Sequence, residues 1–514
     1  MNEATFKNPV LPGFYPDPSI CRVGGDFYLV NSSFEFFPAL PLHHSTNLVD
    51  WRPIGHALDR GSQIDLSRTP TSQGLFAPTI RFHGGRFYLV CTDVSGIGNF
   101  IIQAERAEGP WSDPLPIAIE GIDPSLFFYR GEAWLTVSAP DQQGIWLARL
   151  DVESGCLLDA PSLVWKGTGG KYPEGPHLFL RDGWFYLLIS EGGTEYGHMI
   201  TVARSRDILG PYEPCSRNPI GSHRSLDHPL QATGHADWVE LESGDWWMVF
   251  LAIRPLGYPP MHHLGRETCL APVHWDGDGW PVVPLPLPMR LPVPFAHSTT
   301  AVVEGIRFRD EFDEPFPDPG WIHRRTPRQD AWSLVRTPGS LSLRCAPPCL
   351  DDPEPLAFLG RRIRDHSFRA ATLLDFKPAD TGDRAGLVVH YNERHWSALE
   401  MGIGAAGRGV RFARRCGSLR AESEWHALPE GPVELAVSAG WDGSDKAYWR
   451  FEVRLPEGWK ELGASEVRHQ STELAGGFIG NLTALYATGS GRDSSTWAEF
   501  AWFEEIANPT IETL

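Results

Sequence analysis

The chain has 514 residues, of which 42% are hydrophobic and 21% charged, so it is long and apolar enough for more than one folded core. Its 45 basic and 64 acidic residues give a net charge of −19, which disfavours nucleic acid and anionic membrane as partners and favours a small neutral ligand. No stretch is apolar for long enough to cross a bilayer.

A short motif recurs five times in the first 280 residues, each time followed by a turn with glycine and by an aromatic, strand-like run such as Asp26–Val30. Its copies are Asp17-Pro18-Ser19-Ile20, Ala77-Pro78-Thr79-Ile80, Asp123-Pro124-Ser125-Leu126, Gly175-Pro176-His177-Leu178 and His235-Ala236-Asp237-Trp238. Each copy predicts a β-hairpin, and repetition at similar intervals is typical of repeat architectures. Five hairpin units indicate a five-bladed β-propeller.

The symmetry of a propeller brings the first residue of each motif to one end of the axis. These ring positions are Asp17, Ala77, Asp123, Gly175 and His235, and Glu174 comes one residue before the fourth. We therefore expect three carboxylates, Asp17, Asp123 and Glu174, to meet in one cavity. A single Asp before Pro is usually structural, because it caps backbone N–H groups in turns. Its recurrence at equivalent positions favours a functional site.

Paired carboxyl groups on opposite sides of a glycosidic bond can protonate the leaving oxygen and deprotonate a water. The acid needs a pKa raised by burial or by a neighbouring carboxylate, which three clustered acids would supply. Glu174 has the longer side chain, which suits reaching a leaving oxygen.

Aromatic side chains accompany the first two blades. Phe34 and Phe36 share one face of an extended segment, where they could pack between blades or form a platform for a ligand. Phe76 comes just before the ring position Ala77 and could also face the axis.

Two polar residues of blade five have several interpretations. His235 could be a hydrogen-bonded core residue, a neutral donor to a ligand, or a ligand of an axial Ca²⁺ together with carboxylates and waters. Arg266 could pair with Glu267 in solvent, or it could point into the ring, hold sugar hydroxyls and lower the pKa of a neighbouring Asp. No paired His spacing indicates Zn²⁺.

The sequence predicts two domains: a propeller over residues 1–295, whose Pro-rich strap at 281–294 should be extended without a regular ladder, and a β-sandwich over residues 305–514. Neither part shows a long helix. The predicted sandwich strands are Ser340–Cys345, Phe368–Phe376, Ala385–Met401, Val410–Ala421, Val433–Ser438, Tyr448–Leu455, Phe478–Ala487 and Trp497–Ile506.

The eight cysteines form no Cys-x-x-Cys pair and fall mostly in strand-like runs, which favours free buried thiols. The N-terminal residues show no apolar run after a basic start. We therefore expect the reducing cytoplasm.

Four segments together, at residues 8–19, 121–127, 173–177 and 191–194, resemble glycoside hydrolase family 43. The resemblance covers essentially the whole chain and is closest to β-xylosidases and α-L-arabinofuranosidases with a C-terminal concanavalin-like β-sandwich. It implies an inverting, exo-acting enzyme on a five-bladed propeller.

The resemblance also implies roles for individual residues. Asp17 matches the general base, Glu174 the general acid, and Asp123 the residue that orients the acid and tunes its pKa. The positions that match the sugar pocket are Phe34, Thr194, His235 and Arg266, with Phe76 standing where many xylosidases have Trp.

The resulting hypothesis is an exo-glycosidase that releases a terminal pentose, foremost β-D-xylose from xylo-oligosaccharides, with α-L-arabinofuranosidase or dual activity as the alternative. It requires no cofactor, although the axis could hold Ca²⁺, and the oligomeric state stays open. Two rivals are a retaining sucrose- or fructan-cleaving propeller, whose Asn-Asp-Pro, Arg-Asp-Pro and Glu-Cys signals are absent, and a non-catalytic sugar-binding propeller.

Overall fold

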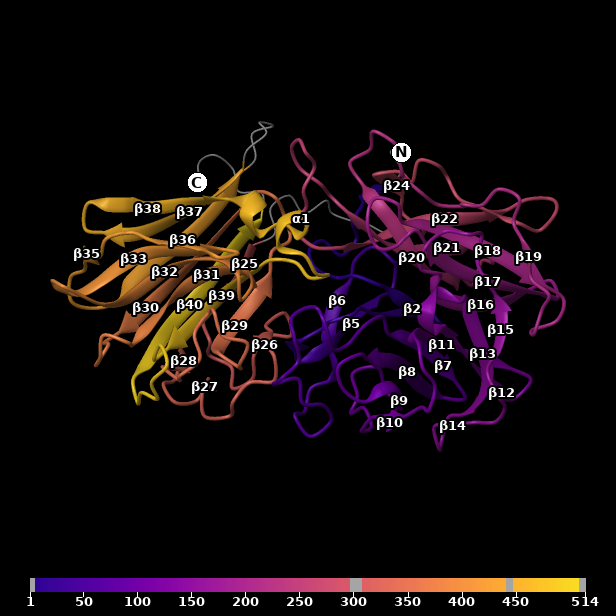
Figure 1. The fold of residues 1–514 in the computed structure, drawn as a ribbon, viewed down its shortest axis with the longest axis horizontal. Coiled ribbons are helices and arrows are strands. Elements are labelled where there is room, and N and C mark those ends of the chain that lie inside the picture. Colours follow the sequence, from indigo (N-terminus) through magenta and orange to yellow (C-terminus); the bar gives the residue numbers. More distant parts are fainter. Residues whose placement is uncertain (1–4, 296–306, 441–446, 508–514) are drawn as a thin grey trace. The chain divides into compact units, whose positions relative to one another are not determined.

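The computed structural model describes residues 5–295, 307–440 and 447–507. The chain forms two compact units, both built of β-strands (Figure 1). The first comprises Met1–Ile64, Gln73–Arg254 and Arg266–Val302, and the second comprises Asp65–Ser72, Pro255–Gly265 and Val303–Leu514. The described helices are short, namely η1 (Pro140–Gln142), η2 (Val467–Gln470) and α1 (Thr472–Ala475), and none of them is long and apolar enough to span a membrane.

The first unit is a five-bladed β-propeller, as the repeat predicts. Blade one contains β2 (Ser19–Val23), β3 (Asp26–Val30), β5 (Ala39–Ser45) and β6 (Arg52–Leu58). The short strand β4 (Phe36–Phe37) lies between β3 and β5 in the sequence but is not part of this sheet. Blade two contains β7 (Thr79–His83), β8 (Arg86–Asp93), β9 (Gly98–Ala104) and β10 (Leu115–Pro116). Blade three contains β11 (Ile122–Tyr129), β12 (Glu132–Ser138), β13 (Ile145–Asp151), β14 (Cys156–Leu157) and β15 (Ser162–Trp165).

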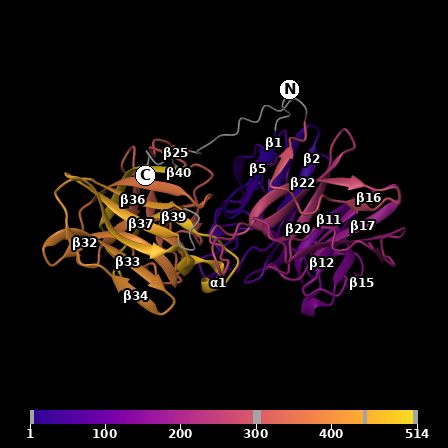
Figure 2. The ribbon, with the colours of Figure 1, turned by 90° about the horizontal axis from the view of Figure 1, so that it is seen from above.

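Blade four contains β16 (Glu174–Arg181), β17 (Trp184–Glu191), β18 (Met199–Ser205) and β19 (Glu213–Pro214). Blade five contains β20 (Gln231–Glu240), β21 (Trp246–Ile253), β22 (Glu267–Trp275) and β23 (Pro281–Val282). The first strand of every blade is its innermost, and each of these five strands contacts the next in a closed ring from β2 through β7, β11, β16 and β20 back to β2 (Figures 1 and 2).

The turns between the first two strands explain why these hairpins could be predicted. In blades two, three and four both loop residues have positive φ, as a two-residue type I′ turn requires. The pairs are Gly84-Gly85, Arg130-Gly131 and Asp182-Gly183. The twist of this turn matches that of the flanking strands, so the glycine specifies the hairpin.

The N-terminal segment closes the propeller. β1 (Thr5–Lys7) pairs antiparallel with β24 (Arg290–Pro292), and the Asn8 side chain donates to the Leu270 carbonyl at 2.9 Å and accepts from its N–H at 2.8 Å. The prediction that the Pro-rich strap forms no ladder was therefore wrong for these residues. Arg290 and Leu291 keep their N–H groups, and proline is tolerated at the end of an edge strand.

The second unit is a β-sandwich of two antiparallel sheets, as predicted. One sheet contains β25 (Arg307–Asp310), β27 (Trp332–Ser333), β28 (Leu341–Arg344), β30 (Phe368–Phe376), β36 (Val433–Gly440), β37 (Tyr448–Leu455), β38 (Gly458–Glu466) and β40 (Trp497–Ala507). The other contains β29 (Ala357–Arg362), β31 (Arg384–Asn392), β32 (His395–Gly404), β33 (Gly407–Cys416), β34 (Leu419–Glu422), β35 (His426–Ala427) and β39 (Leu482–Thr488). β26 (His323–Arg324) belongs to neither sheet.

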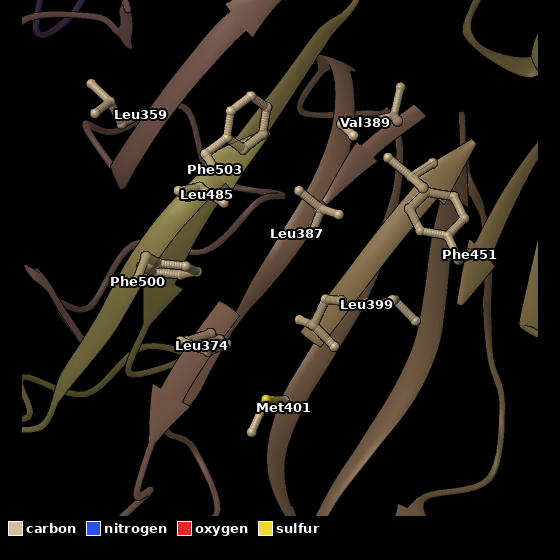
Figure 3. Packing of buried hydrophobic residues seen from close by; sticks show 14 of the residues in the cluster. Leu359, Leu374, Leu387, Val389, Leu399, Met401, Phe451, Leu485, Phe500 and Phe503 are labelled. Carbon is tan, nitrogen blue, oxygen red and sulfur yellow. The ribbon is translucent and has the colours of Figure 1, made fainter. Parts of the chain in front are cut away.

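Alternate residues of both sheets fill the core between them (Figure 3). Two predicted strands are in fact hairpins. Ala385–Met401 divides into β31 and β32, and Val410–Ala421 divides into β33 and β34. Polar residues mark the first turn at Asn392-Glu393-Arg394, and Gly417-Ser418 mark the second, so the sequence contained turn signals that the prediction overlooked. The start of the second domain predicted at residue 305 lies outside the described residues.

Two short segments from the propeller half of the sequence pack in the sandwich unit. Leu256, Met261 and Leu264 of residues 255–265 join the sandwich core. Thr69 of residues 65–72 accepts from Arg325 Nε at 2.7 Å. The two units are thus interleaved along the chain.

Candidate active site

Four of the five ring positions share one backbone conformation. The φ angles are 52° at Asp17, 55° at Asp123, 57° at Gly175 and 46° at His235. Left-handed φ is unfavourable for residues with a Cβ, and such residues cluster at functional sites. The same conformation at the same point of four blades shows that these positions are structurally equivalent.

Asp17 is buried and surrounded by donors. Arg266 forms a bidentate pair with it, Nη1 to Oδ1 at 2.6 Å and Nη2 to Oδ2 at 3.3 Å, and Ser32 Oγ donates to Oδ2 at 2.5 Å. His235 Nδ1 lies 3.8 Å from Oδ1. Burial alone would raise the pKa of Asp17, but Arg266, His235 and Ser32 together lower it below its ordinary value. Asp17 is therefore ionised.

Asp123 is also buried, but no cation contacts it directly in the described structure. Its Oδ2 accepts from the N–H of Gly175 at 3.1 Å. Burial, followed by the negative charges of Glu174 and Asp17, raises the pKa of Asp123 well above its ordinary value. Asp123 therefore loses its proton only at a higher pH than an exposed aspartate would.

Glu174 begins β16 and keeps a partly exposed carboxyl, whose Oε1 lies 3.1 Å from His198 Nε2. His198 Nδ1 lies 3.3 Å from the carbonyl oxygen of Ala232. A carbonyl only accepts, so Nδ1 of His198 carries the proton that points to Ala232, and Nε2 is the ring nitrogen that faces Glu174. His198 was missed from the sequence, although it ends the polar run Glu191–His198.

The residues predicted to line a sugar pocket gather around Arg266. Its Nη1 donates to Thr194 Oγ1 at 3.1 Å, and its guanidinium lies 5.7 Å from the Phe34 ring centre. The rings of Phe34 and Phe76 are 5.4 Å apart. The Arg266 side chain thus points toward the circle of ring positions around the propeller axis, and Phe34 and Phe76 form one aromatic wall beside it.

His235 packs against the fourth ring position. The His235 backbone N–H donates to Ser190 Oγ at 2.6 Å, which fixes the turn. A Cβ at Gly175 would lie 3.0 Å from its imidazole, so a side chain at residue 175 would crowd this ring. The carboxylate of blade four comes from Glu174, one residue earlier. Burial lowers the pKa of His235 and favours the neutral ring.

A second polar layer lies two residues deeper along each innermost strand. Its five buried members are Ser19, Thr79, Ser125, His177 and Asp237. Arg81 Nη1 donates to Asp237 Oδ2 at 2.8 Å, and its Nη2 lies 3.0 Å from His177 Nδ1. Burial lowers the pKa of His177 to about 3, so this ring is neutral. The guanidinium of Arg81 therefore occupies the axis with Asp237 as its counter-ion.

This layer fixes the two Asp-Pro-Ser turns. Ser19 Oγ donates to Asp237 Oδ2 at 2.7 Å, and Ser125 Oγ lies 2.9 Å from His177 Nδ1. Arg81 was not predicted from the sequence, because it lies four residues beyond the ring position Ala77. Within the described residues, no group of three or more His, Cys, Asp or Glu side chains is arranged to hold a metal ion.

Known proteins are similar to this chain in sequence and in fold. The model of glycosyl hydrolases family 43 matches residues 6–281, and that of the β-xylosidase C-terminal concanavalin A-like domain matches residues 309–505. A non-reducing end α-L-arabinofuranosidase of Bacteroides ovatus is 38% identical over 98% of this chain and 95% of its own. A xylosidase/arabinosidase of Butyrivibrio fibrisolvens is 36% identical over 97% and 99%.

A solved structure titled Bacteroides ovatus xyloglucan PUL GH43B superposes with a TM-score of 0.92 at 37% identity, covering 98% of this chain and 99% of the other. A five-bladed propeller with clustered acids, joined to this sandwich, defines the chain as a glycoside hydrolase that acts on oligosaccharides. It belongs to glycosyl hydrolase family 43.

Proposed function

We propose that the chain is an inverting exo-glycosidase that releases a terminal pentose, foremost β-D-xylose from xylo-oligosaccharides. The observation that supports this most strongly is the opposite pKa shift of two buried carboxyl groups at equivalent blade positions. Arg266 lowers the pKa of Asp17, whereas burial and the negative charges nearby raise the pKa of Asp123. An ionised base beside further carboxyl groups in one site is what inverting hydrolysis needs.

In the proposed reaction Asp17 accepts a proton from water as the water oxygen attacks the anomeric carbon. Glu174 donates its proton to the departing oxygen as the glycosidic bond breaks. One proton enters the enzyme at Asp17 and one leaves at Glu174, so both must return to their starting states through solvent. Asp123 holds the Glu174 peptide through Gly175 and its charge regulates the proton on Glu174.

The closed axis supports release of single sugars. Arg81, His177 and Asp237 fill the axis below the ring, so a saccharide that enters at Asp17 cannot pass through the propeller. Phe34 and Phe76 offer an apolar face for the terminal ring, and Arg266 and Thr194 offer donors to its hydroxyls.

NMR of the first product from nitrophenyl β-D-xyloside tests the proposal, because inversion gives α-xylose before mutarotation. Initial β-xylose would mean two successive inversions and a covalent intermediate, which contradicts the role given to Asp17. Absence of turnover of both nitrophenyl β-D-xyloside and nitrophenyl α-L-arabinofuranoside would contradict the proposal that the substrates are pentosides.

α-L-Arabinofuranosidase activity is the second candidate. The relative from Bacteroides ovatus is named for it, and Phe76 is smaller than the Trp that many xylosidases have at this position. Parallel assays on nitrophenyl β-D-xyloside and nitrophenyl α-L-arabinofuranoside decide between the two. A ratio of kcat/KM above ten in favour of the arabinoside would reverse the ranking.

We also propose that catalysis needs no bound metal. The guanidinium of Arg81 supplies a positive charge on the axis, where the sequence allowed for Ca²⁺. Activity should therefore be equal with and without EDTA, and a loss that Ca²⁺ restores would show that an axial ion is required.

The cellular setting is a proposal as well. All eight cysteines are free thiols, which suits the reducing cytoplasm. The charge of −19 disfavours nucleic acid and anionic membrane as partners. Fractionation of expressing cells tests the location, and light scattering tests whether the chain forms a homo-oligomer.

A further inference from the structure

One sheet of the sandwich has a second buried face, opposite the core. Leu485, Leu387 and Leu399 point into the core from β39, β31 and β32 (Figure 3). Side chains of a strand alternate between faces, so the residue beside each leucine belongs to the other face. Tyr486 and Glu400 stand there, each paired in register with Gly386 of the strand between them.

This face contains a cavity of about 300 Å³ over the floor formed by Tyr486 and Glu400. The residue between these two is Gly386, so no side chain separates them. A larger residue is excluded there, because a Cβ on Gly386 would come 1.8 Å from the backbone oxygen of Leu399. Asp351 and Arg384 also line the cavity. Its size is at the lower end of the range for small-molecule sites, which suits one sugar unit.

The charges around the cavity are nearly balanced. Glu400 accepts from Arg411 Nε at 2.9 Å and from the hydroxyl of Tyr486 at 3.2 Å. Asp351 accepts from Trp396 Nε1 at 2.9 Å and from Arg420 Nη1 at 2.7 Å. A neutral ligand therefore suits this cavity better than an ion.

Arg384 has unused hydrogen-bonding capacity. Its Nη1 is 3.7 Å from Glu400, too long for a hydrogen bond, and its buried Nε has no hydrogen-bond partner among the described residues. Buried donors without acceptors are costly, and buried ion pairs such as Glu400–Arg411 add little stability on their own. A stability role accounts poorly for this polar group, whereas sugar hydroxyls would satisfy it.

We propose that this cavity is a second saccharide site, separate from the catalytic ring, that binds one unit of a neutral oligosaccharide without cleaving it. Its carboxylates Asp351 and Glu400 both accept hydrogen bonds from arginines, an arrangement for holding a ligand and not for cleaving it. Charged side chains that bond hydroxyl groups give strong, directional contacts. The site would retain a chain whose other end reaches an active site on the same or another molecule.

The test titrates xylotriose into full-length Glu174→Gln protein by calorimetry, which suppresses turnover during the measurement. We expect two binding events. In the same background Arg384→Gln should weaken one of them about 10-fold, the size of one lost hydrogen bond to a charged group, and leave the other unchanged. Hydrolysis of nitrophenyl β-D-xyloside by the single variant Arg384→Gln should equal that of the parent.

Arg414→Gln is the matched control, because Arg414 lies on β33 and donates to the Ala464 carbonyl without lining the cavity. It should leave both events intact. If Arg384→Gln does not fold, the more exposed Arg420 replaces it as Arg420→Gln.

A single binding event that Arg384→Gln and Arg420→Gln leave unchanged would overturn the proposal, as would tighter binding of glucuronate than of xylotriose. The proposed function fails separately, through absence of wild-type turnover, because the sandwich event is measured by binding alone.

Discussion

Asp17 and Asp123 show how far environment outweighs local sequence. Both precede Pro-Ser, both lie at the start of an innermost strand, Asp17 two residues before β2 and Asp123 second in β11, and both have φ near 50°. Yet the pKa of Asp17 is lowered and that of Asp123 raised, and in both cases burial by itself raises the pKa. The difference is Arg266, which forms a bidentate pair with Asp17 only. One guanidinium thus decides which carboxylate can act as a base.

We predict that Arg266→Met moves the acid limb of the pH–rate profile to higher pH. Without the guanidinium the effect of burial prevails, so the pKa of Asp17 rises and the base becomes protonated at mildly acidic pH. We expect kcat/KM at the optimum to fall about 100-fold or more.

Arg266→Lys is the control for this experiment. It keeps a positive charge but loses the planar fork, so its acid limb should move less. An acid limb that stays in place in Arg266→Met would show that Asp17 is not the titrating base.

We predict that Asp123→Asn abolishes most activity and yet stabilises the fold at alkaline pH. The folded pKa of Asp123 is raised, so its contribution to stability is present below the unfolded pKa and is lost as the pH rises through the folded pKa. Asn does not titrate and can still accept from Gly175. Relative to the parent, the free energy of unfolding should gain about 1 kcal/mol or more between pH 4 and pH 8.

Asp17→Asn should show the opposite pH dependence of stability. Because the folded pKa of Asp17 is lowered, its carboxylate stabilises the fold above the unfolded pKa, and this stabilisation is lost as the pH falls through the folded pKa. Thermal unfolding of Asp123→Asn between pH 4 and pH 8, and of Asp17→Asn from pH 4 downward, checks the pair of predictions. Equal pH dependence in the two variants would contradict the opposite pKa shifts.

At the scale of elements, the five innermost strands depend on one axial ion pair. Asp237 is fully buried and Arg81 is nearly so. We predict that Arg81→Met destabilises the chain by about 3–5 kcal/mol, because it leaves a buried carboxylate uncompensated. The double variant Arg81→Met/Asp237→Asn should recover part of this loss. Urea unfolding measures both, and additive losses would show that the two side chains are not coupled.

The elements that could be predicted from sequence are those specified locally. The five hairpins follow from Gly turns and alternating apolar residues, and the repeat then places Asp17, Asp123 and Glu174 together. The turn inside Ala385–Met401 was missed although Asn392-Glu393-Arg394 interrupt the apolar run, because the two flanking apolar stretches were read as one strand.

The missed residues depend on contacts distant in sequence. His198 meets Glu174, and Arg81 meets Asp237 across 156 residues. No spacing of residues in the local sequence predicts either contact. Arg266 was identified with two open interpretations, and only the structure shows that it contacts Asp17 instead of pairing with its neighbour Glu267.

At the scale of the whole molecule, the two units cannot be separated by cutting between the domains. Residues 255–265 lie in the propeller half of the sequence, yet Leu256, Met261 and Leu264 belong to the sandwich core. Asn481 Nδ2 also donates to the His263 carbonyl at 2.8 Å. In a fragment that ends at residue 302, residues 255–265 would lose their packing partners in the sandwich. This segment directly precedes Arg266 in the sequence.

We predict that a fragment of residues 1–302 binds a hydrophobic dye, unfolds at lower temperature than the full chain and loses activity. Exposing three buried aliphatic side chains costs about 5 kcal/mol on the scale of about 1.5–3 kcal/mol each. Co-expression with residues 303–514 should restore part of the activity. A fragment as stable and active as the full chain would show that these contacts are dispensable.

The interleaving also bears on the order of synthesis. The Thr69 carbonyl accepts a hydrogen bond from Arg325, which is synthesised 256 residues later. The Ser72 hydroxyl accepts one from the Phe478 N–H, which is synthesised 406 residues later. At a translation rate of roughly 5–20 residues per second, the second interval lasts about 20 to 80 s. A blade that emerges early from the ribosome therefore keeps residues 65–72 without their native neighbours until the chain is nearly complete. Ribosome-associated chaperones would have that interval in which to engage this loop.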